Sequence, residues 1–165
     1  MMNVINRVLA LFVCLFFSFQ TAALAKVEVT WTEPDKYSDI KDSFSGYQTT
    51  KDDAFYNIEK ELNRLAKKLP DGYLLKLEVT DLDLAGETHS RNIRVVRHMF
   101  PPRIKFTYQL LDGGDNVLLE KQENIRDTSF MNGVSLRHKN QAFGFEKQLV
   151  EDWFKDSFTD YLVRN

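Results

Sequence analysis

Cysteine is nearly absent from this chain, which has one such residue, Cys14, among 165. Cys14 lies inside an apolar run at positions 8–19, close to the N-terminus. Once that run is removed no thiol remains, which excludes disulfides, thiol catalysis and cysteine metal sites. Lipid attachment at Cys14 is disfavoured, because bulky apolar residues occupy positions 11–13 where small ones are needed.

A hydrophobic run long enough to span a membrane is also missing. The run at 8–19 covers about 12 residues, too few to cross a hydrocarbon layer of roughly 30 Å as a helix. Arg7 precedes it, and Ala23-Leu24-Ala25 follows as a small-x-small cleavage site. We therefore predict a signal peptide at 1–25, export to the periplasm or beyond, and no transmembrane segment in the mature chain.

Neither sign of charge dominates. The chain has 22 Lys and Arg against 24 Asp and Glu, and removal of the leader takes away one arginine, leaving a net charge near −3. Nothing in this balance suggests nucleic acid as a partner. Residues 26–165 are enough for one domain. A domain of this size can bury about 68% of the surface that its unfolded chain exposes, so it does not need disulfides for stability.

Hydrophobic periodicity predicts an α+β fold with the order β-α-β-β-β-β-α. The predicted strands cover 26–31, 73–84, 92–100, 104–110 and 117–126, and the helices cover 50–69 and 143–162. Both helices have one apolar stripe, so we expect them on one face of a mixed sheet of four to five strands. The first strand-helix-strand unit should place its two strands parallel.

The alternation of the second strand reverses at Asp81. Leu75, Leu77 and Val79 share one parity, whereas Leu82 takes the opposite parity. A strand cannot exchange its faces without a change of register. We predict a β-bulge or a strand end at this point, with Asp81 and Asp83 satisfied by backbone N–H groups or arginine.

The segment from Asp81 to Glu87 is the most suggestive candidate site. Its start, D-x-D-x-x-G, resembles a calcium loop, but Ala85 then occupies a ligand position and Asn92 stands where a bidentate Glu is needed. One hypothesis is a metal-assisted hydrolase that uses four residues of this region. These are Asp81, Asp83, Glu87 and His89. The alternative is that the carboxylates are structural.

A basic run follows, with no acid between Thr88 and Leu111. One hypothesis is a patch that binds an anionic lipid headgroup or glycan. The alternative is that these cations pair with carboxylates inside the fold. The five residues are Arg91, Arg94, Arg97, Arg103 and Lys105.

Recognised catalytic and cofactor signatures are missing. The histidines, His89, His98 and His138, show no zinc-site spacing, and we interpret them as isolated surface residues. No G-x-S-x-G elbow occurs, and Gly113-Gly114 is a turn because no helix opens after it. The sequence therefore implies no cofactor and identifies no enzyme class.

Several short motifs occur in an order that resembles a known bacterial family. They are Y-S-D-I at 37–40, L-P-D-G at 69–72, V-T-D-L-D-L-A-G-E at 79–87, P-P-R-I at 101–104, Y-Q-L-L-D at 108–112 and E-K…W-F at 146–154. Together they resemble the family catalogued as domain of unknown function 3016. The resemblance implies a small exported protein of one domain and supplies no catalytic residue.

The leading hypothesis is an exported, non-catalytic binding or accessory module of the bacterial envelope. Its partner would be a protein or an anionic lipid or glycan. The metal-assisted hydrolase is one alternative, and a structural or stress-related exported protein is another.

Overall fold

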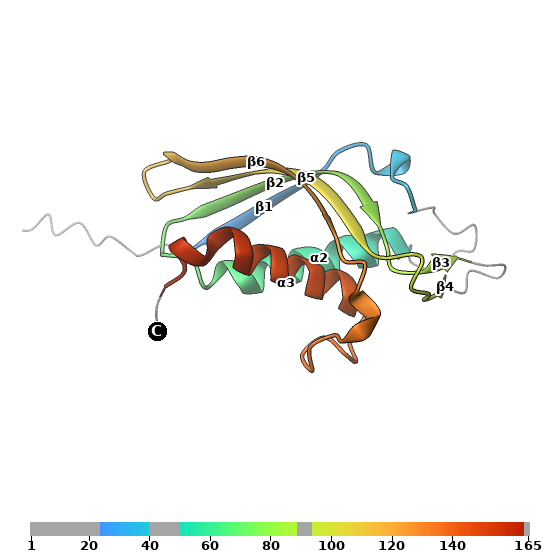
Figure 1. Ribbon diagram of the computed structural model, residues 1–165. Helices are drawn as coiled ribbons and strands as arrows, with labels where there is room; N and C mark the ends of the chain where they lie inside the picture. The colour runs from blue at the N-terminus through green and yellow to red at the C-terminus, as the bar shows by residue number, and fades with distance from the viewer. Residues whose placement is uncertain (1–23, 40–49, 89–93, 164–165) are drawn as a thin grey trace, which may run out of the picture.

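A four-stranded mixed sheet forms the centre of the protein in a computed structural model (Figure 1). The structure describes residues 24–39, 50–88 and 94–163. The strand order is β1-β2-β5-β6. β1 is parallel to β2, as predicted, and the other neighbouring strands are antiparallel. The strands are β1 (Lys26–Trp31), β2 (Leu74–Asp83), β5 (Arg103–Leu111) and β6 (Val117–Arg126).

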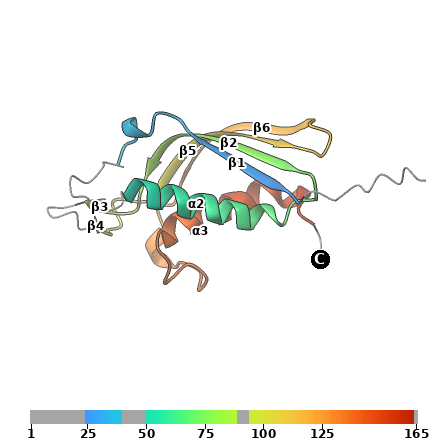
Figure 2. The ribbon, with the colours of Figure 1, turned by 180° about the vertical axis from the view of Figure 1, so that it is seen from behind.

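Two helices, α2 (Thr50–Ala66) and α3 (Gly144–Phe158), lie side by side on one face of this sheet (Figures 1 and 2). The predicted α+β class and the placement of both helices are confirmed. In α2 the apolar side chains recur at three- and four-residue spacings and are buried, which explains why this segment forms an amphipathic helix. They are Ala54, Ile58, Leu62 and Leu65.

Aromatic residues of α3 fill the space between helix and sheet. Trp153, Phe154 and Phe158 are buried. The Trp153 ring lies edge-on to Phe106 and Tyr108, with centroids 4.8 and 5.2 Å apart. Phe55 of α2 stacks on Trp31 of β1, with ring centroids 3.9 Å apart.

The predicted bulge in β2 is confirmed. The pairing of β2 with β5 shifts between Val79 and Asp81, so that Leu77 and Leu82 both face the core although their parities differ. The irregularity brings Asp81 and Asp83 to the end of β2, beside Arg103 of β5.

The predicted strand at 92–100 is largely wrong. Within the described residues it is reduced to β4 (Arg94–Val95), which pairs with the unpredicted β3 (Glu87–Thr88) in a separate ribbon. Gly86 turns the chain out of the main sheet with a φ of +86°, and a Cβ there would lie 2.4 Å from the Val95 oxygen. The remaining short elements are the 3₁₀ turns η1 (Pro34–Lys36), η3 (Phe130–Asn132) and η4 (Thr159–Tyr161).

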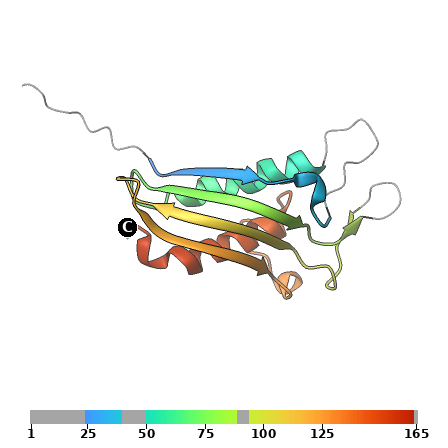
Figure 3. The same ribbon diagram turned by 90° about the horizontal axis from the view of Figure 1, so that it is seen from above.

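The face of the sheet opposite the helices is not covered by another described element (Figure 3). One cross-strand row of it consists of Thr30, Glu78, Thr107 and Gln122. The sheet and the two helices thus form two layers, and the second face of the sheet is exposed to solvent. Among the described residues, no helix has both the length and the apolar content needed to cross a bilayer.

Candidate functional site

Asp81 is held at the bulge by three donors. Its Oδ1 accepts the Ser38 backbone N–H at 2.8 Å, and its Oδ2 accepts the Ser38 hydroxyl and Arg103 Nη2, each at 2.9 Å. Arg103 also lies 3.6 Å from Asp83. Burial, and after it the charge of Asp39, raises the pKa of Asp83. The prediction of backbone N–H groups or arginine as partners is confirmed for Asp81, whereas the Asp83 carboxylate has the Arg103 ion pair at 3.6 Å and no hydrogen bond among the described residues.

The cations of the basic run that the structure describes each face a carboxylate. Arg94 bonds Asp39 at 2.7 Å and also the Gly86 carbonyl at 3.1 Å. Arg97 lies 3.2 Å from Glu87, and Lys105 lies 3.9 Å from Asp81. His89 and Arg91 lie outside the described residues. These ion pairs agree with the second interpretation of the basic run, in which its cations pair with carboxylates inside the fold.

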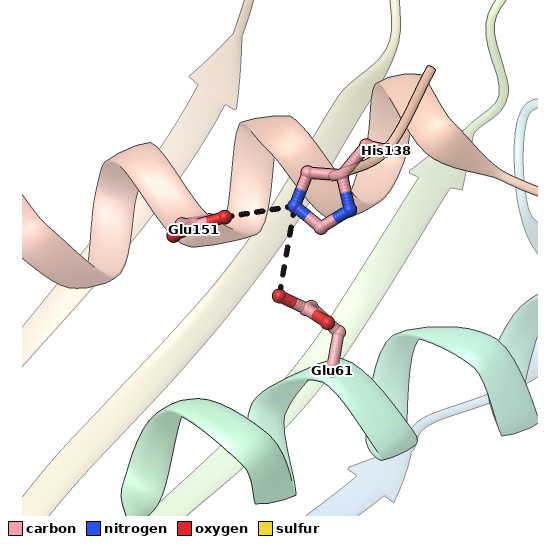
Figure 4. Close-up of side chains that lie close together, drawn as sticks. All are labelled: Glu61, His138 and Glu151. Carbon is pink, nitrogen blue, oxygen red and sulfur yellow. Dashed lines mark hydrogen bonds and ion pairs between the residues drawn. The ribbon is translucent and has the colours of Figure 1, made fainter. Parts of the chain in front are cut away.

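A buried group that the sequence did not single out joins the two helices to the segment before α3 (Figure 4). His138 has a side chain with 0% exposure, and its Nε2 lies 2.8 Å from Glu151 Oε2 on α3 and 3.7 Å from Glu61 Oε1 on α2. The interpretation of His138 as a surface residue is therefore wrong. His98, by contrast, is exposed as predicted.

Two further cations complete this group, which we call the His138 cluster (Glu61, Arg64, His138, Glu151 and Lys155). Arg64 Nη2 lies 2.5 Å from Glu61 and 3.5 Å from Glu151, and Lys155 Nζ lies 3.2 Å from Glu151. Burial raises the pKa of Glu151, but the hydrogen bonds from His138 and Lys155 prevail and lower it from 4.5 to about 2. The carboxylate is therefore ionised at neutral pH.

The His138 cluster offers ligand atoms of the types that bind a metal ion, since one atom each from Glu61, His138 and Glu151 lie within 4.8 Å of one another. However, the Arg64 guanidinium already contacts both carboxylates. A cation at this point would have to displace it. The contacts fit a buried ion-pair network that fixes the segment 127–143 onto both helices.

A pocket of about 250 Å³ opens at the N-terminal end of α3, which we call the loop-end pocket. Its apolar lining comes from three parts of the chain: the end of β2, the segment after β4, and the approach to α3. These residues are Leu84, Val96, Val134, Phe143 and Phe145. Loops that enclose a pocket on a rigid sheet and helix are a common location of binding sites.

Buried polar atoms lie at the same pocket. Glu146 is 3% exposed and accepts the Ala85 backbone N–H at 2.7 Å, and burial raises the pKa of its carboxyl. His138 also lines the pocket, and its buried Nδ1 has no hydrogen-bond partner among the described residues. Such an atom is costly to leave unpaired in a native structure.

The two segments that approach the loop-end pocket also carry exposed apolar side chains. Eight large apolar side chains are exposed in the described residues, and four of them belong to the segments after β4 and before α3. These are Val96, Met99, Met131 and Leu136, the last with 91% of its surface accessible. Val96 itself lines the pocket. Exposed apolar surface next to a pocket is typical of an interaction site.

Sequence reasoning missed the His138 cluster and the loop-end pocket. The segment 81–87 and the basic run that it selected contribute Ala85 and Arg94 to the pocket lining. Of the four proposed metal ligands, His89 lies outside the described residues, so the proposed set as a whole stays a prediction. Among the described residues, the carboxylate and histidine group close enough to hold a metal ion is the one at His138.

Comparisons with curated proteins and with solved structures gave no match. The family described as "Protein of unknown function (DUF3016)" matches residues 25–156, which is most of the chain and includes every strand and nearly all of α3. The protein therefore belongs to the DUF3016 family.

Proposed function

We propose that the protein is an exported, non-catalytic binding module that docks a protein partner at the loop-end pocket. The observation that carries this proposal is an apolar pocket formed by two segments that also hold four of the eight exposed large apolar side chains. Val96 lines the pocket and is also exposed, and the exposed Leu136 lies two residues from Val134, which lines the pocket. Interfaces are commonly built around an apolar anchor of this kind.

The size of the pocket favours an amino-acid side chain as occupant. Pockets for cofactors and drug-sized ligands enclose roughly 300–1,000 Å³, and this pocket, at about 250 Å³, is smaller. Exposed Arg137 and Lys139 lie beside it. We therefore expect the partner to insert an apolar side chain that is flanked by acidic residues.

The assignment as a non-catalytic protein is supported by the roles of the acids that the sequence offered as catalysts. The Asp81 carboxylate is hydrogen-bonded to Ser38 and forms an ion pair with Arg103, and Glu87 forms an ion pair with Arg97. The same contacts weaken the hypothesis of an anionic lipid or glycan partner, because they neutralise the described part of the basic run. A protein partner remains the stronger candidate.

Export is supported by the coincidence of three boundaries. The expected cleavage site follows Ala25, the family match begins at residue 25, and β1 begins at Lys26. The folded domain thus begins where the leader is expected to end.

Capture from an envelope extract tests the proposed surface. Leu136→Glu and Val96→Glu should each abolish capture of the partner, because a charge would replace apolar contact area. The matched control is Tyr56→Glu on α2, where the aromatic side chain is 63% exposed and does not line the pocket. Equal capture by all three variants would contradict the proposal.

A further inference from the structure

No described strand pairs with the outer edge of β6, and the direction of the backbone groups on this edge follows from the pairing of the sheet. Thr32 N–H donates to the Val79 carbonyl and Lys26 N–H to the Tyr73 carbonyl, each at 2.9 Å. Odd-numbered residues of β2 up to Val79 therefore point their backbone groups to β1. Successive residues alternate, so Lys76 and Glu78 point theirs to β5.

The same alternation carries across the sheet to β6. Lys76 pairs with Gln109, so Tyr108 must point its backbone groups away from β2, to its partner Lys121 on β6. Consequently the even-numbered residues of β6 direct N–H and C=O away from the sheet. These residues are Glu120, Gln122, Asn124 and Arg126.

In one register, this edge can pair with the same edge of a second copy so that opposite charges face each other. If a two-fold axis passes through Gln122, antiparallel pairing sets Lys121 opposite Glu123 of the second copy, and does so twice. Leu119 then faces Ile125, two apolar side chains on the core side. Moving the axis by one residue sets Lys121 against Lys121 or Glu123 against Glu123, which is unfavourable.

Features that usually protect an edge strand are weak here. β6 contains no proline, and its irregularity lies at the far end, near Leu119, outside the central part. Within residues 24–39, 50–88 and 94–163, neither Lys121 nor Glu123 has an ion-pair partner. Both charges oppose pairing with an arbitrary strand and favour the register centred on Gln122.

We propose that two copies of the chain join β6 to β6, antiparallel and centred on Gln122, to give one continuous sheet with four strands from each copy. Main-chain hydrogen bonds supply the attraction and the Lys121–Glu123 pairs select the register. None of these β6 residues lines the loop-end pocket, so the proposed dimer does not rest on the function proposed for that pocket.

Disulfide trapping tests the register. In a Cys14→Ser background, which removes the natural cysteine, Gln122→Cys should form a covalent dimer on mild oxidation. Directly opposed residues of a hydrogen-bonded pair have Cα atoms about 5.5 Å apart, within disulfide range. Glu120→Cys and Asn124→Cys are matched controls on the same edge, because each faces the other position and lies about 14 Å along the strand from its own copy.

Mixed Glu120→Cys and Asn124→Cys chains should cross-link to each other, although neither cross-links to itself. Equal cross-linking at all three positions, or none at Gln122→Cys, would overturn the register.

A charge swap tests the pairing without cysteine. Lys121→Glu or Glu123→Lys should each raise the dimer dissociation constant, measured by sedimentation velocity, at least about tenfold, because two opposite-charge pairs become like-charge pairs. The Lys121→Glu/Glu123→Lys double variant should restore the dimer. A wild-type chain that stays monomeric at millimolar concentration, or a double variant no better than the singles, would refute the proposal.

Discussion

Glu146 and Glu151 lie on the same helix, both buried, yet their pKa values shift in opposite directions. Glu146 accepts one backbone N–H, and burial is the largest effect on its carboxyl, so its pKa is raised. The Glu151 carboxylate is also buried, but it has hydrogen bonds with His138 and Lys155 and lies near the charges of Lys155 and Arg64, so its pKa falls to about 2. The hydrogen bonds and neighbouring charges outweigh burial at Glu151 and do not at Glu146.

Acid should therefore weaken the fold through Glu151. A carboxyl whose pKa is lowered on folding stabilises the protein above its unfolded pKa, near 4.5, and loses that contribution as the pH falls to about 2. We expect Glu151→Gln to lower stability at pH 7 by on the order of 3 kcal/mol and to flatten the dependence between pH 4.5 and 2.

Urea unfolding at each pH measures this effect. Glu146→Gln is the control, because a raised pKa contributes stability that declines as the pH rises, which is the opposite sign. An unchanged pH slope in Glu151→Gln would contradict the ion-pair role of the His138 cluster.

Asp81 should contribute stability and no metal binding. Asp81→Ala removes the acceptor of Ser38 and Arg103, and we expect a loss of about 1–3 kcal/mol. Denaturant melts with and without added divalent cation should show the same difference. A loss that appears only when the cation is present would indicate a metal site.

At the scale of elements, the helices pack on the sheet through their apolar stripes. The bulge in β2 keeps apolar side chains on the face that packs against the helices, on both sides of the register shift. Leu77 and Leu82 lie on either side of the register shift and are both buried. The separate β3–β4 ribbon leaves the main sheet at Gly86 and contributes Val96 to the loop-end pocket through the segment that follows.

Trp153 should be the costliest residue of α3 to truncate. It is 6% exposed and lies edge-on to Phe106, Tyr108 and Phe158. Trp153→Ala should lower the unfolding free energy by about 3–5 kcal/mol. Tyr56→Ala, at a position 63% exposed, should change it by less than about 0.5 kcal/mol. Similar losses for both variants would show that α3 does not anchor the core.

The sequence predicted where the main strands and both helices occur along the chain, because strands repeat apolar residues every two positions and helices every three to four. It also predicted the irregularity in β2, because the alternation reverses at Asp81. It could not predict the role of His138, since Glu61 and Glu151 are distant from it in the sequence and meet it through packing. A signal was present: Glu61 follows Ala54 and Ile58 on the buried stripe of α2. An acid on an apolar face requires a cationic or hydrogen-bonding partner.

At the scale of the whole molecule, the helices cover one face of the sheet, and the loop-end pocket lies at the end where α3 begins. The open sheet face and the outer edge of β6 lie apart from the pocket lining. The two proposed surfaces, one for an apolar anchor and one for a second strand, therefore share no residue.

Export with cleavage after Ala25 predicts a defined mature N-terminus. The chain expressed from Met1 in a bacterial host should be recovered from the periplasm or medium with Lys26 as its first residue. Intact-mass measurement identifies that residue. A chain that keeps residues 1–25 would disprove the signal peptide.

Photo-cross-linking in the cell tests the binding proposal most directly. A photoreactive amino acid in place of Leu136, which is 91% exposed, should trap one defined partner, and Val96→Glu in the same chain should remove that cross-link. The same photoreactive group in place of Tyr56 should trap nothing specific. Identical cross-links from both positions, or a cross-link at Leu136 that survives Val96→Glu, would contradict docking at the loop-end pocket.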